Sequence, residues 1–307
     1  MSWTIEDIPD LAGRRALVTG VTGGLGEETA LGLARHGADV VVTARDAAKA
    51  APVLERLRAQ ARGDVDLVDL DLADLGSVQR AADSLLNSHV RLDILVNNAG
   101  VMAPPKRRTT DGFELQIGTN HLGHFALTGR LWPLLRNSYA RVVFVSSIAH
   151  RMAKGIDLRS LEPGGDPRAY QRWRSYGESK LANLMTALEL GERAANTGVV
   201  SVAAHPGYAA TDLQRTGPEL EGGPTVQSRA MMLLNQVVAQ PATAGAWPLL
   251  LAASLPGLAS GAYLGPSGIG EVRGEPTLVG TSAAARDRSA RAALWAASEV
   301  ATGVSFP

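Results

Sequence analysis

The stretch "TGVTGGLG" at residues 19–26 decides the fold, because it joins the apolar run "RRALV" at 14–18 to a segment with helical spacing. Its glycines Gly20, Gly24 and Gly26 have the spacing GxxxGxG. In a dinucleotide-binding turn, such glycines permit a tight bend, close approach of the backbone to a pyrophosphate, and close packing of helix on strand. The N-terminus of the following helix offers unpaired N–H groups to phosphate. In this context the stretch predicts a dinucleotide site rather than a plain tight turn.

The rest of the chain alternates between short apolar runs and longer segments with helical spacing. The runs are rich in β-branched residues and lack polar–apolar alternation, which is typical of strands covered on both faces. They lie at 14–20, 38–44, 65–71, 92–100, 140–147, 198–207 and, more weakly, 260–266. Helices are expected at 26–37, 47–60, 77–88, 111–137 and 175–196, with Pro52 indicating a late start of the second. This order predicts an α/β fold, a single doubly wound Rossmann domain over 1–307, with a parallel sheet of about seven strands and helices on both faces.

Composition and charge exclude several classes of protein. The 307 residues carry 30 basic and 30 acidic side chains, so we expect no nucleic-acid partner and no anionic membrane partner. The absence of Cys excludes disulfides, thiolate metal sites and cysteine nucleophiles, and favours a cytoplasmic location. The N-terminus lacks the pattern of a signal peptide. The apolar stretch 246–260 contains two prolines and is too short to span a bilayer, so it is expected to be a buried helix with a break.

The end of the second strand carries the residue that would discriminate between nicotinamide cofactors. In Rossmann proteins that prefer NAD, an acidic residue near this point holds the ribose 2′-hydroxyl. Here the chain reads "VVVTARD", with Ala44 at that place, Arg45 after it, and Asp46 as a candidate helix N-cap. A guanidinium suits a 2′-phosphate, so NADP (NADPH) is the expected cofactor and NAD is less favoured. The alternative interpretation of Arg45 is a solvated loop residue.

A second candidate site lies in "SYGESKLAN" at 175–183. Tyr176 and Lys180 are four residues apart in a predicted helix and therefore share a face. A tyrosine packed over a lysine stem would be structural, whereas a proton donor beside a cation would be catalytic. A free tyrosine has a pKa of about 10. Because a neighbouring ammonium favours the phenolate, we expect Lys180 to lower the pKa of Tyr176.

Several motifs occur in an order and spacing that resemble the short-chain dehydrogenase/reductase family, over residues 14 to about 266. They are "TGVTGGLG" (19–26), "DLDLADL" (69–75), "NNAG" (97–100), "NHLGHF" (120–125), "VSS" (145–147), "YGESK" (176–180) and "HPGYAAT" (205–211). The wording of "TARD", "NHLGHF", "SKLAN" and "HPG" is most similar to the retinol dehydrogenase and carbonyl reductase branch, whose members mostly use NADPH.

The resemblance implies a catalytic tetrad of Asn120, Ser147, Tyr176 and Lys180. It implies cofactor contacts from Gly20, Thr22, Gly24, Leu25, Gly26, Arg45, Asp71, Leu72, Asn98, Ala99, Gly100, Tyr176, Lys180, Pro206, Gly207 and Thr211. Within that set, Asp71 and Leu72 would border the adenine. Asn97, Ala99 and Gly100 would line the ribose side. Pro206, Gly207 and Thr211 would hold the nicotinamide end.

The tetrad residues would divide the work of moving a proton to or from a carbonyl oxygen. Tyr176 would be the general acid and base, and Lys180 its electrostatic partner. Ser147 would hold the substrate oxygen, and it is preferred over Ser146 because "SIAH" fits the family's S-x-x-[GAH] pattern. The resemblance implies that Asn120 holds a water molecule that links Lys180 to solvent as a proton relay. The structural alternatives are a helix cap or core polar residue for Asn120 and a turn hydroxyl for Ser147.

Four histidines lie close to these motifs. His121 and His124 are three residues apart on a predicted helix, but no third ligand is placed beside them, so no metal is expected. His150 and His205 are interpreted as loop or packing residues.

Two variable segments, at about 150–174 and 208–240, are expected on the substrate side. The first resembles an insertion of the retinol dehydrogenase branch and carries Tyr170 and Trp173 near its end. The second carries Met231, Met232, Leu233 and Leu234, which suit either an apolar lid for a lipophilic substrate or a helix packed on the domain. A helix expected at 290–300, anchored by Leu294 and Trp295, would cover the cleft or form a subunit contact.

The predicted function is an NADP(H)-dependent oxidoreductase that interconverts a small-molecule carbonyl, an aldehyde or ketone, and its alcohol. Because the N-terminus lacks an apolar anchor, retinoid metabolism itself is not expected. The alternatives are a non-catalytic nucleotide-binding sensor on the same fold and a double-bond reductase or epimerase. A homo-oligomer is a further possibility that the family resemblance raises.

Overall fold

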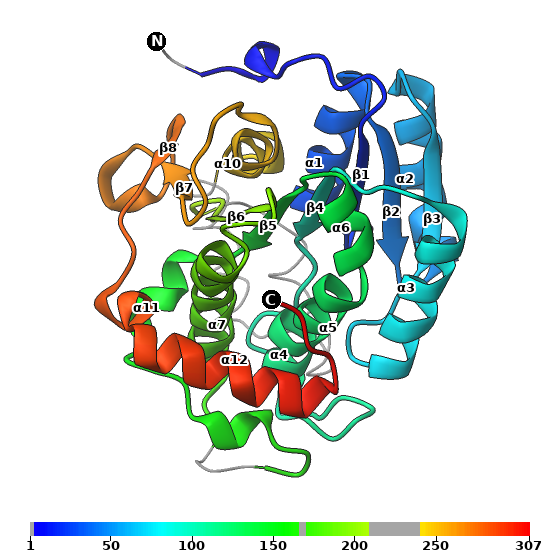
Figure 1. Ribbon diagram of the computed structural model, residues 1–307. Coiled ribbons are helices and arrows are strands. Elements are labelled where there is room, and N and C mark those ends of the chain that lie inside the picture. The colour runs from blue at the N-terminus through cyan, green and yellow to red at the C-terminus, as the bar shows by residue number, and fades with distance from the viewer. Residues whose placement is uncertain (1–2, 166–169, 209–239) are drawn as a thin grey trace, which may run out of the picture.

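The computed structural model describes residues 3–165, 170–208 and 240–307, and its centre is one twisted sheet (Figure 1). The strand order is β3-β2-β1-β4-β5-β6-β7-β8. The strands are β1 (Arg15–Thr19), β2 (Asp39–Ala44), β3 (Val65–Asp69), β4 (Ile94–Asn97), β5 (Arg141–Val145), β6 (Val200–Ala204), β7 (Tyr263–Pro266) and β8 (Pro276–Leu278). All pairs are parallel except β7 with β8. The predicted Rossmann sheet is therefore confirmed, with one antiparallel edge strand added.

The eighth strand has no sequence signal of the kind the other seven have. It is only three residues long, begins with Pro276, and exposes Thr277 and Leu278. A proline is tolerated at an edge because that position need not donate to a neighbouring strand. Short, exposed edge strands are common and do not read as apolar runs.

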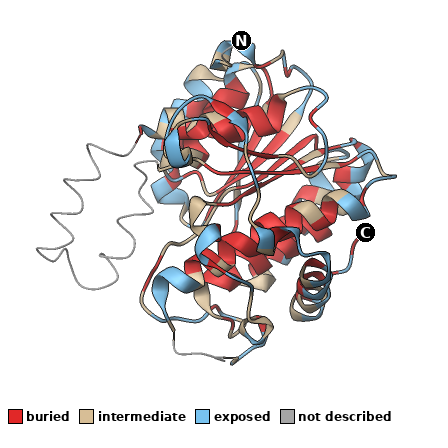
Figure 2. Cartoon of the chain, turned by 90° about the vertical axis from the view of Figure 1, so that its left-hand side faces the viewer, coloured by how far each residue is buried: buried red, intermediate tan, exposed pale blue. Residues whose placement is uncertain are grey.

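Helices cover both faces of the sheet, and their inner faces are buried (Figure 2). The longer helices are α1 (Gly24–Arg35), α2 (Ala47–Gln60), α3 (Leu75–Ser88), α5 (Gly123–Arg130), α7 (Arg172–Arg193), α10 (Ala242–Ser254) and α12 (Arg288–Thr302). Side chains alternate along each strand, so Leu17 belongs to one core cluster and Val18 to the other. The Val18 cluster is packed by α1, α2 and α10, and the Leu17 cluster by α3, α5 and α7.

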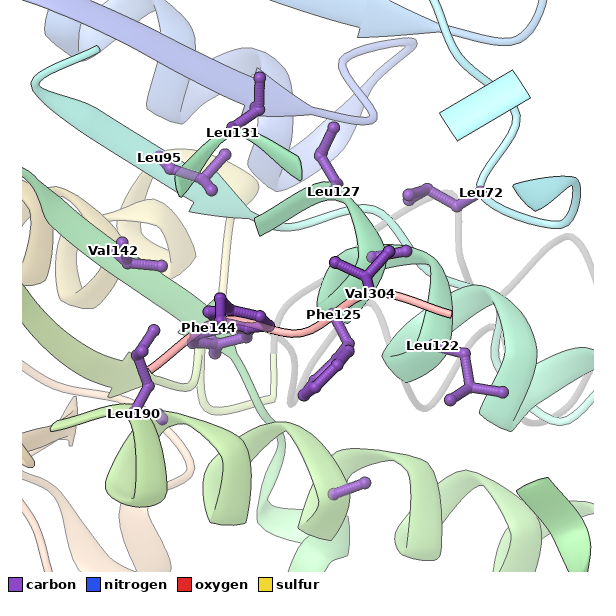
Figure 3. Packing of buried hydrophobic residues seen from close by; sticks show 14 of the residues in the cluster. Leu72, Leu95, Leu122, Phe125, Leu127, Leu131, Val142, Phe144, Leu190 and Val304 are labelled. Carbon is purple, nitrogen blue, oxygen red and sulfur yellow. The ribbon is translucent and has the colours of Figure 1, made fainter. Parts of the chain in front are cut away.

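The Leu17 cluster is closed on the outside by the C-terminal segment. Figure 3 shows Phe125, Phe144 and Val304 in this cluster. Trp295 of α12 is buried, and its ring lies 4.9 Å from that of Phe125 and 4.7 Å from that of Phe306. Helix α12 therefore covers the helices next to the site and contributes to the core, with Leu294 and Trp295 as its predicted anchors.

Helix α10 occupies the apolar stretch expected to be buried. It contains Pro248, ends at Ser254 before Pro256, and buries most of its length. None of the helices in the described ranges combines the length and the apolarity that a bilayer crossing needs.

Two helix predictions were wrong in detail. Helix α2 starts at Ala47 rather than late, because the Asp46 carboxylate accepts a hydrogen bond from the Lys49 N–H at 3.1 Å. Pro52 then lies inside the helix on its exposed side, where water can bond the carbonyl left without a partner. The expected helix 111–137 is divided into four pieces: α4 (Leu115–Ile117), the π-helical turn η2 (Gly118–Leu122), α5, and α6 (Trp132–Asn137).

The first variable segment is built from short 3-10 turns. They are η3 (Ile148–Met152) and η4 (Leu158–Leu161), and α7 starts at Arg172. The second variable segment, with Thr211 and Met231 to Leu234, lies almost entirely outside the described residues.

Buried histidines make the stability of this fold sensitive to acid. Burial lowers the pKa of His121 to about 3, and those of His124 and His205 to about 4. A histidine in an unfolded chain has a pKa of about 6.5, so below this pH the unfolded state binds more protons than the folded state. The free energy of unfolding should therefore fall as the pH drops from about 6.5 toward 4, by on the order of 1 kcal/mol per histidine per pH unit.

The substitution His121→Gln isolates one of these groups. Glutamine can still bond the hydroxyl of Ser298, which lies 2.8 Å from His121 Nε2. In urea unfolding at pH 7.5 and pH 5, the variant should lose about 2 kcal/mol less on acidification than the wild type. Equal losses in the two proteins would contradict the prediction.

Candidate active site

The glycine loop closes tightly on itself at the C-terminal end of β1. Gly20 and Gly24 have φ values of +72° and +62°, which disfavour other residues. A Cβ on Gly26 would lie 2.1 Å from the carbonyl oxygen of Gly20 and 2.6 Å from Asn98 Nδ2. Among the described residues, no side chain caps the N-terminus of α1, so its first N–H groups face the loop without such a partner. The loop and this helix end have the tight geometry that the spacing predicts, and we call them the cradle; binding of a dinucleotide there stays a prediction.

The hydroxyl of Thr19 joins this loop to the end of β4. Its oxygen accepts hydrogen bonds from the N–H groups of Asn98 and Ala99, at 2.9 and 3.0 Å. In the other direction, Asn98 Nδ2 donates to the carbonyl oxygens of Thr19 and Gly20, at 2.8 and 3.1 Å. Asn98 and Ala99 are therefore held directly beside Gly20.

His124 extends the same network to the turn that carries Asn120. Burial keeps its ring neutral near neutral pH, and its Nδ1–H donates to the main-chain oxygen of Asn120 at 2.9 Å. Its Nε2 is then an acceptor, and the Thr19 hydroxyl donates to it at 2.9 Å. Thr19 and His124 were not among the predicted site residues, because a single threonine and a histidine in a motif do not reveal a contact across 105 positions.

The remaining predicted cofactor residues lie in the glycine loop itself or just beyond the C-terminal ends of β2 and β3. Thr22 is exposed and Leu25 half-buried. Arg45 is exposed at the end of β2, whose Thr43 carbonyl accepts the Gly20 N–H at 3.2 Å. Asp71 accepts the Ala73 N–H at 2.9 Å.

Leu72 was predicted to border the adenine of the cofactor, but its side chain is buried in the protein core. Its side chain belongs to the Leu17 cluster, and a Cβ on Gly123 would lie 2.5 Å from its carbonyl oxygen. The side chain is therefore part of the core beneath α5.

Three predicted tetrad residues meet at the end of β5. Ser147 caps η3 at the end of this strand, and α7 carries Tyr176 and Lys180 on one face. The Ser147 hydroxyl lies close enough to Tyr176 to act on its pKa. Lys180 Nζ lies 5.9 Å from the centre of the Tyr176 ring and donates to the carbonyl oxygen of Val145 at 3.1 Å.

The two candidate serines face different partners. Ser146 is buried, and its hydroxyl donates to the main-chain oxygen of Lys180 at 2.8 Å. Ser147 is half-buried and faces Tyr176. Of the two serine hydroxyls, that of Ser147 is therefore the one that lies beside the Tyr176 side chain.

The expected direction of the shift in the pKa of Tyr176 was wrong. Burial raises the pKa of Tyr176 to about 12, although the Ser147 hydroxyl acts in the opposite direction. Burial also lowers the pKa of Lys180 to about 8. Loss of solvation therefore outweighs the attraction between the two groups. Tyr176 keeps its proton near neutral pH.

Asn120 lies next to this cluster with its side chain occupied by protein groups. Its Oδ1 accepts the Val101 N–H at 2.7 Å, and its Nδ2 donates to the Val101 carbonyl at 3.0 Å and to Ser179 Oγ at 2.9 Å. A Cβ on Gly100 would lie 2.9 Å from Asn120 Oδ1 and 3.5 Å from Lys180 Nζ. The absence of a side chain at Gly100 thus leaves space for both Asn120 Oδ1 and Lys180 Nζ beside its backbone. The water relay through Asn120 stays a prediction.

Pro206 and Gly207, which are predicted to hold the nicotinamide end, follow β6, and Gly207 has a φ of +68°. Thr211 lies outside the described residues. On the substrate side, the ring of Trp173 meets that of Tyr176 edge to face at 6.1 Å, and the side chain is 53% exposed. Tyr170 is instead tied down, since its hydroxyl donates to the Pro104 carbonyl at 2.7 Å.

The predicted histidine pair forms no metal centre in the described parts of the chain. His124 faces Thr19, whereas His121 faces Ser298 of α12. Nowhere in residues 3–165, 170–208 and 240–307 do three or more potential metal-binding side chains gather.

Comparison with known proteins places this geometry in a family. The model of the short chain dehydrogenases matches residues 14–156. The chain is 43% identical over 207 residues to retinol dehydrogenase 12 of Mus musculus, which covers 67% of this chain and 64% of that protein. For the first curated relatives the match spans 64–66% of their length.

Two solved structures share the architecture. A crystal structure of an uncharacterized protein from Mycobacterium paratuberculosis is 40% identical, with a TM-score of 0.80 and coverage of 100% of both chains. The RhlG/NADP active-site complex of Pseudomonas aeruginosa is 28% identical, with a TM-score of 0.61 and coverage of 83% of this chain and 94% of that one.

The sheet and its glycine loop define a dinucleotide-binding α/β protein. Within that class, the chain belongs to the short-chain dehydrogenase/reductase family, near the retinol dehydrogenases. The family consists of oxidoreductases that bind a nicotinamide cofactor.

The substitution Gly26→Ala tests the cradle. Because the new methyl group would overlap the Gly20 carbonyl, the loop must shift, and affinity for NADPH should fall at least about tenfold. Gly280→Ala is the matched control, since a Cβ there meets nothing within 4 Å. The NADPH affinity of both variants is measured by titrating each protein into NADPH and following the fluorescence of the cofactor. Wild-type affinity in Gly26→Ala would contradict the assigned geometry.

Proposed function

We propose that this protein is an NADP(H)-dependent oxidoreductase that interconverts an aldehyde or ketone and its alcohol, with Tyr176 as the proton donor. The observation that carries the proposal is the contact of Tyr176 with Ser147, beside Lys180, at the end of β5. This end of the parallel sheet is the same edge at which the glycine loop opens, and ligands of such sheets bind there.

The residues present fit a nicotinamide dinucleotide. Gly20 and Gly26 let the loop pack tightly on itself in front of α1, and the N-terminus of α1 supplies N–H groups and a favourable dipole for its pyrophosphate. Arg45, exposed at the end of β2, supplies a fork of donors for a 2′-phosphate. The solved neighbour described as an RhlG/NADP complex supports the same cofactor. When bound, NADPH supplies the hydride for carbonyl reduction.

The protein's own part is to hold the carbonyl oxygen and deliver a proton to it. The hydroxyls of Ser147 and Tyr176 converge, so both can donate to one substrate oxygen. A Tyr176 with a pKa of about 12 is protonated in the resting enzyme, as the reductive direction requires. As the tyrosine gives up its proton, the charged ammonium of Lys180 stabilises the phenolate. Lys180 has a pKa of about 8, so this support weakens above that pH.

The substrate is proposed to be lipophilic. The ring of Trp173 contacts that of Tyr176 edge to face, and Met152 lies beside the next residue of α7, since a Cβ on Gly177 would be 3.8 Å from Met152 Cβ; Trp173 and Met152 are both exposed. Both present apolar surface at the approach to the reacting hydroxyl. The relatives named retinol dehydrogenase support an apolar alcohol or aldehyde as the class of substrate.

The substitution Tyr176→Phe should abolish turnover while NADPH still binds, because it removes only the hydroxyl that donates the proton. We expect kcat for reduction of a panel of aldehydes, ketones and quinones to fall at least about 100-fold. Tryptophan-to-NADPH energy transfer monitors binding. An active variant would refute the role of Tyr176, and a wild type that binds NADPH without turnover would favour a sensor.

The substitution Arg45→Ala tests the cofactor preference. The wild type should bind NADPH more tightly than NADH, and the variant should lose about 1.5–3 kcal/mol of NADPH binding, the typical contribution of a hydrogen bond to a charged group. Its affinity for NADH should change little. Equal affinities of the wild type for the two cofactors would remove the basis for the preference.

A further inference from the structure

Glu271 has an unusual backbone conformation for its residue type. It ends the short turn η5 (Ile269–Glu271), in the loop between β7 and β8, with a φ of +57°. This left-handed region favours glycine, and the preceding Gly270 occupies it with a φ of +65°. A strained non-glycine residue persists only where its surroundings determine it, and such residues cluster at functional sites. The contacts of its side chain show what holds it there.

The carboxylate of Glu271 bridges two segments that border the nicotinamide end of the site. Its Oε2 lies 3.0 Å from Nε2 of His205, the residue before Pro206 and Gly207. Its Oε1 lies 2.6 Å from an Nη of Arg151, which follows Ser147 by four residues within η3. One side chain thus contacts both the turn after β6 and the segment after β5.

The ring of His205 transmits this contact to the backbone of the turn. The Gly207 N–H donates to Nδ1 at 3.2 Å, so in the neutral ring the proton lies on Nε2 and is donated to Glu271. The side chain of His205 is fully buried, and burial lowers its pKa to about 4, so the ring is neutral near pH 7. The contact is then a hydrogen bond to a carboxylate rather than an ion pair. Two hydrogen bonds thus connect the Gly207 N–H, through the His205 ring, to the carboxylate of Glu271.

Close backbone packing fixes the loop on the turn. A Cβ on Gly265 would lie 2.0 Å from His205 Nε2, so only glycine leaves space for this ring. A Cβ on Gly207 would lie 2.4 Å from the carbonyl oxygen of Val272. The same oxygen accepts the Tyr208 N–H at 2.8 Å. The loop therefore lies directly against the turn that the nicotinamide would contact.

We propose that Glu271 is a positioning residue, which holds the His205–Gly207 turn and the segment after Ser147 in fixed relation around the nicotinamide. This inference rests on the proposed function, because it assumes that Gly207 borders that ring. Of its two arms, the one to buried His205 carries more weight, since Arg151 is 39% exposed and exposed pairs contribute little.

The experiment compares two ligands on the variant Glu271→Ala. One is NADPH, and the other is 2′-phospho-ADP-ribose, which lacks the nicotinamide. The variant should bind NADPH about tenfold more weakly, because the loosened turn must be ordered when the nicotinamide binds, while its affinity for the fragment stays within about twofold. Because misplacement by 1 Å costs up to about 100-fold in rate, kcat for carbonyl reduction should fall by about 10- to 100-fold with little change in substrate KM.

Two further variants separate positioning from folding. Glu271→Gly removes the carboxylate but relieves the backbone strain, so its Tm should be at or above that of Glu271→Ala while the NADPH defect is the same. Glu271→Gln keeps one acceptor and should restore part of the NADPH affinity. Glu275→Ala, an exposed carboxylate of the same loop, is the control and should behave as the wild type.

The outcomes that would overturn the proposal are distinct. Equal losses for NADPH and the fragment, or defects that follow Tm across the variants, would show a general structural role. A wild type that binds NADPH without turnover would refute the proposed function, while the ratio of the two affinities would still test Glu271. A wild type that does not bind NADPH would refute both.

Discussion

The site depends on one hydroxyl, that of Thr19 at the end of β1. It accepts two N–H groups from the end of β4 and donates to the ring of His124. These bonds join the glycine loop, the neighbouring strand and the π-helical turn that carries Asn120, which come from three separate parts of the chain. The hydroxyl is completely buried, so a lost partner would leave a polar group without solvent to replace it. The cofactor cradle and the proton-transfer cluster therefore share one frame.

Burial sets the electrostatic state of the proposed catalytic cluster more strongly than its charges do. Both groups are shifted toward their neutral forms, since burial raises the pKa of Tyr176 and lowers that of Lys180. A protonated phenol beside a readily titrated amine is a resting state suited to giving a proton away. The high pKa is thus compatible with the proposed direction of reduction, although it reverses the shift expected from sequence.

Much of the architecture could be predicted because buried parallel strands read as apolar runs and glycines mark the dinucleotide turn. The edge strand β8 could not, since it is short and exposed. The late start predicted for α2 from Pro52 was wrong, because the carbonyl that loses its helix hydrogen bond at a proline is exposed and can bond water instead. The motifs also predicted which residues of the tetrad would gather, and the structure brings Ser147, Tyr176 and Lys180 together. The partners of Thr19, His124 and Glu271 lie far away in sequence, and no local pattern encodes such contacts.

The turn η2 has a consequence for how the protein is made. Its His121 contacts Ser298 of α12, whereas His124, three residues on, contacts the end of β1. The turn is therefore fastened through the adjoining His124 to the end of β1, and through its own His121 to a residue 177 positions further along the chain. During translation the nucleotide cradle can form early, but the turn beside it lacks its outer support until α12 has left the ribosome. Assembly of the site therefore waits for α12, which is synthesised well after the glycine loop.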